Sequence, residues 1–254
     1  MQAVLAETAA LITGAGTGIG AAVARELAAA GAAVVLVGRR SGPLDEIAAQ
    51  IRDSGGVAEA FAADITDRAQ ATRAVEHAIA AFGRLDIVVN NAGAMLVGPV
   101  ADAPEGEWER MIDVNLKGAL YITQAAIPHL VKSAAAEPRR VADVVVVSST
   151  AGRVVRPGNA VYNLTKFGIN AFSEALRQEL QPQRVRVGVV EPGAVATDLA
   201  SHTRAELRES VEAQVGAIER LEPADIAEAV AYMVGRPRRV AVNEMLVRAG
   251  DQTW

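Results

Sequence analysis

The chain has 254 residues, with 25 basic and 30 acidic side chains and a formal charge of −5 at neutral pH. This balance argues against a nucleic-acid partner, because phosphate recognition needs a concentrated basic face, and the absence of cysteine excludes disulfides, thiolate metal sites and a cysteine nucleophile. No apolar stretch reaches the ~18 residues of a membrane span, and Met1–Thr8 lacks the pattern of a signal peptide, so we expect a cytoplasmic protein without a membrane partner.

Short β-branched runs alternate along the chain with alanine-rich segments of helical length. The predicted strands are Ala9–Thr13, Ala33–Val37, Val57–Ala62, Leu85–Val89, Ala142–Val147, Val185–Val190 and Met245–Val247. The predicted helices are Gly18–Ala30, Leu44–Ser54, Arg68–Phe82, Val114–Val131, Ala160–Leu180 and Ala224–Val234. Several strands are apolar throughout, as expected for strands covered on both faces. The pattern therefore predicts one α/β domain with a doubly wound parallel sheet.

Two connections stand out from this alternation. Ala134–Arg140 has the composition of an exposed loop. Ala194–Leu221 is much longer, is charged, and shows weak helical periodicity over Arg204–Val215. A connection of that length in a compact domain is often functional, so we expect residues 194–221 to form a lid over a binding site.

A glycine-rich run directly follows the first predicted strand and opens the first predicted helix. Its candidate binding residues are Gly14, Gly16, Thr17, Gly18, Ile19 and Gly20. Glycines at this place allow a tight turn and let backbone N–H groups approach a pyrophosphate at the helix N-terminus. The run therefore predicts a dinucleotide site.

The end of the second strand indicates which dinucleotide binds. An NAD site needs a carboxylate ~20 residues beyond the glycine run to hold the ribose 2′-hydroxyl, whereas this chain offers Arg39 and Arg40. A guanidinium group matches a phosphate well, so we predict NADP(H). Asp64, after the third strand, is placed to accept a hydrogen bond from the adenine amino group, while Asp67 suits a helix cap.

Candidate catalytic side chains lie in two later segments of the chain. Tyr162 and Lys166 are four residues apart near the start of a predicted helix, which places both on one face. A nearby cation favours the phenolate and so lowers the pKa of a tyrosine. Ser149, after the fifth strand, supplies a hydroxyl that can orient a carbonyl oxygen at the same edge. The turn Asn91-Ala92-Gly93 follows the fourth strand at that edge, where ligands of such sheets collect.

The glycine run, the Asn-Asn-Ala-Gly turn, Ser149 and Tyr-x-x-x-Lys, in this order and spacing, resemble the short-chain dehydrogenase/reductase family. The resemblance covers roughly residues 8–247 and implies a seven-stranded Rossmann fold with the cofactor across the carboxyl edge. It implies that Tyr162 is the general acid/base, that Lys166 binds the nicotinamide ribose and lowers the pKa of the tyrosine, and that Ser149 holds the substrate oxygen. Asn115 matches the family asparagine that kinks a helix and holds a water. The further implied cofactor contacts are Ile65, Asn91, Ala92, Gly93, Pro192, Gly193, Val195 and Thr197.

Finer similarity links the chain to two NADP-linked branches of the family. One branch acts on clavulanate-9-aldehyde and the other on serine and 3-hydroxy acids. The segments that carry this similarity are Met95–Pro99, Trp108–Asp113, Asn170–Glu174 and Asp225–Val230. Most of these residues suit a core or an interface, so they do not identify a substrate.

The expected activity is NADPH-dependent reduction of a small aldehyde or ketone to an alcohol, reversible with NADP and independent of a metal. One alternative is a 3-oxoacyl thioester reductase, whose carrier-protein partner needs a basic patch near the lid. There His202, Arg204 and Arg208 are interspersed with Glu206, Glu209 and Glu212. The other alternative is a redox sensor that binds NADP without turnover, which the complete set of catalytic residues disfavours. The resemblance also implies a homotetramer, with a dimer as the second choice.

Overall fold

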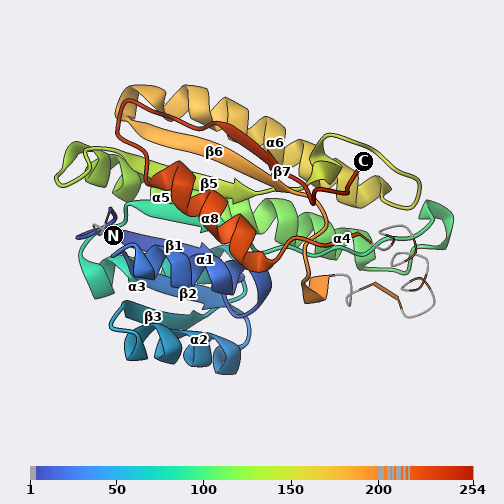
Figure 1. The fold of residues 1–254 in the computed structure, drawn as a ribbon, viewed down its shortest axis with the longest axis horizontal. Helices are drawn as coiled ribbons and strands as arrows, with labels where there is room; N and C mark the ends of the chain where they lie inside the picture. Colours follow the sequence, from blue (N-terminus) through green and yellow to red (C-terminus); the bar gives the residue numbers. More distant parts are fainter. Residues whose placement is uncertain are drawn as a thin grey trace.

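A computed structural model describes residues 4–199, 203–204, 207, 209, 213, 216 and 218–253. Its core is a seven-stranded parallel sheet in the order β3-β2-β1-β4-β5-β6-β7 (Figure 1). The strands are β1 (Ala9–Thr13), β2 (Ala33–Gly38), β3 (Val57–Ala62), β4 (Ile87–Asn90), β5 (Ala142–Val147), β6 (Val185–Pro192) and β7 (Glu244–Val247). The predicted doubly wound Rossmann-type sheet is confirmed.

Helices cover both faces of this sheet (Figure 1). The helices are α1 (Gly18–Ala29), α2 (Ser41–Asp53), α3 (Arg68–Phe82), α4 (Glu107–Ile112), α5 (Ala119–Ala135), α6 (Ala160–Leu180) and α8 (Pro223–Val234). One apolar core lies between the sheet and α1, α2 and α8, and a second lies between the sheet and α3, α5 and α6. Successive strand residues alternate between these cores, which explains why the inner strands read as continuous apolar runs.

The strand order fixes where a ligand can bind. The chain leaves β1 for β2 on one side and returns to β4 on the other, so the crossover direction reverses beside β1. Open sheets of this kind bind ligands in the crevice outside the carboxyl ends of the strands at such a reversal. Within the described residues, no helix combines the length and apolar character needed to cross a membrane.

The segment after β4 differs from its prediction. We expected one helix over Val114–Val131, but the helical path begins with α4 at Glu107, passes through a π-helical turn over Asp113–Gly118 and continues as α5 to Ala135. Gly106, at φ +85°, ends the preceding turn and allows this earlier start. Acidic residues in the first turn of α4 suit the positive end of the helix dipole.

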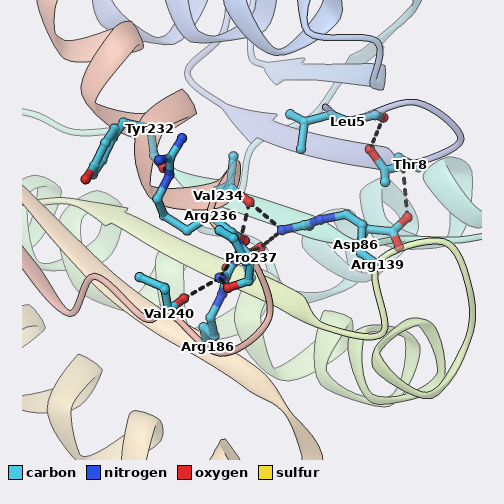
Figure 2. A network of polar contacts seen from close by, with 12 residues as sticks. Leu5, Thr8, Asp86, Arg139, Arg186, Tyr232, Val234, Arg236, Pro237 and Val240 are labelled. Atoms are coloured by element: carbon cyan, nitrogen blue, oxygen red, sulfur yellow. Dashed lines mark hydrogen bonds and ion pairs between the residues drawn. The ribbon is translucent and has the colours of Figure 1, made fainter. Parts of the chain in front are cut away.

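The predicted loop Ala134–Arg140 is also partly wrong. Ala134 is buried within α5. The side chain of Arg139 is largely covered, and its guanidinium pairs with Asp143 at 2.7 Å. It also donates to the carbonyl of Val234 (Figure 2). The predicted lid, residues 194–221, falls partly outside the described residues, as do His202, Glu206, Arg208 and Glu212.

Candidate active site

A cavity of about 590 Å³ lies at the carboxyl edge of the sheet, between the loops that follow the strands. Most of the predicted site residues line it. They are Gly14, Thr17, Gly18, Ile19, Arg39, Arg40, Asp64, Ile65, Asn91, Ala92, Gly93, Ser149, Tyr162, Lys166, Pro192, Gly193, Val195 and Thr197. Gly16, Gly20 and Asn115 are not among the residues that line the cavity. The structure therefore brings together residues at the carboxyl ends of six strands with two residues of helix α6.

The glycine run forms a tight turn between β1 and α1. Gly14 and Gly18 have φ values of +66° and +52°, in the left-handed region that favours glycine. A Cβ on Gly20 would lie 2.3 Å from the Gly14 carbonyl oxygen, so this position accepts no side chain. Thr17, which precedes α1, makes no side-chain cap, so the first N–H groups of the helix are left to a ligand.

Asn91 ties this turn to the end of β4. Its side-chain Nδ2 donates to the carbonyls of Thr13 and Gly14, at 2.9 and 3.3 Å. The Thr13 hydroxyl in turn accepts from the backbone N–H groups of Asn91 and Ala92, at 3.0 and 3.1 Å. Asn91 therefore shapes the glycine turn directly, a role that sequence reasoning did not assign to it.

Charged residues follow β2 and β3 at the carboxyl edge of the sheet. Arg39 and Arg40 are exposed on the cavity wall, and no carboxylate ends β2. Asp64 also lines the cavity, and its Oδ1 accepts from the N–H and hydroxyl of Thr66 at 3.0 and 2.7 Å. Asp67 accepts from the N–H of Gln70 at 3.0 Å and caps α3, as the sequence predicted. Asp64 therefore faces the cavity, whereas Asp67 caps a helix.

Tyr162 and Lys166 lie one turn apart on α6, both buried against the cavity. Burial raises the pKa of Tyr162 to about 12, although a side-chain hydrogen bond with Ser149 acts in the opposite direction. Burial lowers the pKa of Lys166 to about 8, and its Nζ donates to the Val147 carbonyl at 3.0 Å. The net pKa of Tyr162 is therefore raised rather than lowered in this structure, because burial outweighs the opposing hydrogen bond with Ser149.

Asn115 lies within the π-helical turn, where the resemblance placed a helix kink. Its Oδ1 accepts from the N–H of Ala94 at 2.7 Å, and its Nδ2 donates to the Ala94 carbonyl at 2.9 Å. The same Nδ2 donates to the Thr165 hydroxyl at 3.1 Å, and that hydroxyl donates to the Tyr162 carbonyl at 2.8 Å. Asn115 thus connects the loop after β4 to the helix that carries Tyr162.

Sequence reasoning missed Thr165 and two residues that hold the end of β6. Buried Glu191 accepts from Arg153 Nε at 2.6 Å and from Asn170 Nδ2 at 2.8 Å. Gln252 Oε1 accepts from the N–H of Ala194 at 2.9 Å. Thr165 could have been found because it directly precedes Lys166 within the Tyr-x-x-x-Lys motif, whereas the partners of Glu191 and Gln252 are distant in the sequence.

Comparison with known proteins gives matches along nearly the whole chain. Residues 8–208 match the sequence family described as short chain dehydrogenase. An uncharacterized oxidoreductase of Staphylococcus saprophyticus is 36% identical over 245 residues, which cover 96% of this chain and 98% of that protein.

Two solved structures extend this similarity to three dimensions. A 3-ketoacyl-(acyl-carrier-protein) reductase from Brucella melitensis, complexed with NADH, is 34% identical with a TM-score of 0.84, over 97% of this chain and 98% of that chain. The closed form of a serine dehydrogenase complexed with NADP⁺ is 30% identical with a TM-score of 0.88, over 97% of both chains. The fold is therefore shared with enzymes whose structures contain NADH or NADP⁺.

Proposed function

The chain belongs to the short-chain dehydrogenase/reductase family of oxidoreductases, and we propose that it is an NADP(H)-dependent member that reversibly reduces a small aldehyde or ketone to an alcohol. The observation that carries the proposal is the convergence of Ser149, Tyr162 and Lys166 on the cavity that the glycine turn also lines. A fold alone does not fix a function, whereas a complete set of reactive groups in one cavity supports a specific chemistry.

The reactive groups suit the reductive direction. With a pKa of about 12, Tyr162 carries its proton at neutral pH and can donate it to the carbonyl oxygen as the alcohol forms. Ser149 orients that oxygen, and Lys166 binds the ribose hydroxyls of the cofactor. Asn115 is a positioning residue, because its side chain bonds to Ala94 and Thr165 rather than lining the cavity. A bound nicotinamide supplies the hydride for the carbonyl carbon.

The residues at the other end of the cavity fit a dinucleotide with a 2′-phosphate. The turn between β1 and α1 holds glycines where a Cβ would collide, and the first turn of α1 presents its N–H groups without a side-chain cap. Arg39 and Arg40 stand where an NAD site places an acid. We assign the 2′-phosphate to these guanidinium groups, with Asp64, Ile65, Asn91, Ala92, Gly93, Pro192, Gly193, Val195 and Thr197 as the remaining contacts.

A second candidate activity is reduction of a 3-oxoacyl thioester. It is supported by the similarity to the Brucella melitensis reductase, whose reported name gives that substrate type. A non-catalytic NADP sensor is disfavoured, because the chain retains both Tyr162 and Lys166 in the buried arrangement described above. We further propose a single cytoplasmic domain that forms a homotetramer, or else a dimer. Exposed Leu164 and Phe167 on α6 support association through that helix.

The test is fluorescence titration with NADPH and NADH, followed by a carbonyl panel that includes aldehydes, ketones and an acetoacetyl thioester. We expect tighter NADPH binding and turnover of a small aldehyde. Preference for the thioester would favour the second candidate, and NADPH binding without any turnover would favour the sensor.

A single substitution tests the proposed preference for NADPH over NADH. Arg39→Ala should weaken NADPH binding by about tenfold or more, since a hydrogen bond to a charged group contributes roughly 1.5–3 kcal/mol. NADH binding should change little. Arg239→Ala, which removes an exposed arginine outside the cavity wall, is the matched control. Equal weakening of both dinucleotides by Arg39→Ala would contradict the assignment.

A further inference from the structure

A tight turn projects from the loop between Ser149 and Tyr162. The N–H of Asn159 donates to the carbonyl of Arg156 at 3.2 Å, which closes a four-residue turn. Pro157 occupies its second position, and Gly158, at φ +80°, occupies its third. Proline followed by a left-handed glycine is the signature of a type II turn. The first and last residues of the turn, Arg156 and Asn159, both line the candidate active-site cavity.

Contacts on both sides hold this turn in place. The buried side chain of Asn163 donates to the carbonyls of Ala151 and Val154 at 2.6 and 2.9 Å, and it accepts from the N–H of Arg156 at 3.4 Å. The N–H of Gly98 donates to the Gly158 carbonyl at 2.8 Å, which joins the turn to the loop after β4. The backbone of the turn is therefore ordered before any ligand arrives, which reduces the entropic cost of binding.

The charge of the cavity contrasts with that of the whole chain, which is −5. Beyond the groups assigned above to the cofactor and to proton transfer, the charged residues described on the cavity wall are Arg110, Arg156, Arg220 and Asp198. Arg156 is partly buried on this wall, and that burial lowers the pKa of its guanidinium. A partly desolvated cation in a concave site attracts anions.

We propose that the Arg156–Asn159 turn binds a carboxylate of the substrate, so that the enzyme acts on small oxo acids and the matching hydroxy acids. This inference rests on the proposed function and names the substrate class of the same site. A guanidinium fork matches the two oxygens of a carboxylate, and the carboxamide of Asn159 supplies a further donor. The carboxylate is unchanged in the reaction: it holds the acid in the cavity while the carbonyl carbon gains a hydride and its oxygen gains the Tyr162 proton.

The experiment compares a charged substrate with its neutral match. We would measure kcat/KM with NADPH for succinic semialdehyde and for its methyl ester, using the wild type, Arg156→Gln, Arg156→Lys and Arg238→Gln. The wild type should prefer the acid by about tenfold or more. Arg156→Gln should lose roughly 10- to 100-fold on the acid, mainly through KM, and less than about threefold on the ester. Arg156→Lys should recover part of the loss. Arg238→Gln, which removes an exposed arginine away from the cavity wall, should behave as the wild type.

Several outcomes would overturn the inference. Equal kcat/KM for acid and ester in the wild type would do so, as would an equal loss on both substrates in Arg156→Gln, which indicates a structural role. A higher kcat/KM for glyceraldehyde 3-phosphate than for succinic semialdehyde would reassign the turn to phosphate.

A binding measurement separates this inference from the proposed function. Succinate should raise the thermal midpoint of the enzyme with NADP⁺, and Arg156→Gln should abolish that rise. If succinate binds through Arg156 but no carbonyl is reduced, the reductase proposal fails and the carboxylate site stands. If neutral carbonyls are reduced and succinate binds equally to both variants, only the carboxylate site fails. If both readouts are negative, both proposals fail.

Discussion

Two sets of buried ionisable groups, one at each end of the parallel sheet, have different surroundings. At the amino end, buried Asp86 and Asp143 are paired with arginines and with backbone groups. At the carboxyl end, buried Tyr162 and Lys166 border an open cavity, and burial shifts the pKa of each toward its neutral form. Buried charge is tolerated where it is paired and hydrogen-bonded. We infer that the first end stabilises the fold and the second is available for chemistry.

The amino-end network is centred on Asp143. Its carboxylate accepts from Arg139 at 2.7 Å and from Arg186 at 2.7 and 3.0 Å. Both arginines also donate to the carbonyl of Val234, the last residue of α8, and Figure 2 shows them converging on it. Cations at a helix C-terminus complement the negative end of its dipole and satisfy its free carbonyls. The network therefore fastens α8 to β5 and β6.

The largest effect we expect comes from the carboxyl end. Tyr162→Phe removes the proton donor and should lower kcat/KM by roughly 10²–10⁴-fold, the range typical of a general acid. NADPH affinity should change by less than about threefold, and the free energy of unfolding should change little, because the ring still fills its place. Steady-state kinetics, NADPH titration and urea unfolding test this. Turnover near the wild-type level in the variant would refute the assignment of Tyr162.

The second-largest effect should come from the amino end. It should lower the free energy of unfolding and leave the activity unchanged. Asp143→Ala leaves two largely covered guanidinium groups without their buried carboxylate, and breaking a buried ion pair in this way costs about 3–5 kcal/mol. The kcat of the folded variant should match the wild type, because Asp143 lies at the far end of β5 from the cavity. Urea unfolding and kinetics below the transition would measure the two quantities.

A matched control isolates the effect of burial at Asp143. Glu174, also paired with an arginine, is exposed on α6. Water and salt screen such a pair, so Glu174→Ala should leave the unfolding midpoint nearly unchanged. If both variants destabilised the protein equally, or if Asp143→Ala lowered kcat, the division between the two ends would be wrong.

The same contrast explains what the sequence could and could not predict. The strands were placed almost to the residue, because apolar runs such as Ala142–Val147 are set by burial on both faces. Most of the predicted cavity residues could be named because they lie in short local motifs, whereas Arg156 and Arg220 belong to no such motif. The Asp143–Arg186 pair joins residues 43 positions apart, and no local pattern marks it. β4 begins at Ile87 rather than Leu85, and the side chain of Asp86, directly before it, accepts from the N–H of Ala9.

The smallest effect concerns pH and tests the carboxyl end without any substrate. The pKa of Lys166 is about 8 in the folded protein against 10.5 for a free lysine. Between these values the unfolded chain binds more protons than the folded one, so stability should rise with pH. The gain over Lys166→Met should be at most about 1.4 kcal/mol per pH unit. Tyr162, whose pKa is raised from 10.0 to about 12, has the opposite sign and acts between those two values.

Urea unfolding of the cofactor-free wild type and of Lys166→Met, at pH 8.0 to about 9.5, measures this difference below the tyrosine window. Other titrating groups are the same in both proteins and cancel, and so does the loss of the hydrogen bond to Val147, which does not depend on pH. The wild type should gain stability relative to the variant as pH rises. A difference that is constant with pH would mean that Lys166 keeps its ordinary pKa in the folded protein. The charged Lys166 side chain would then be stabilised by its surroundings, as the paired guanidinium groups of Arg139 and Arg186 are at the amino end. The two ends would then not differ in how they hold their cations.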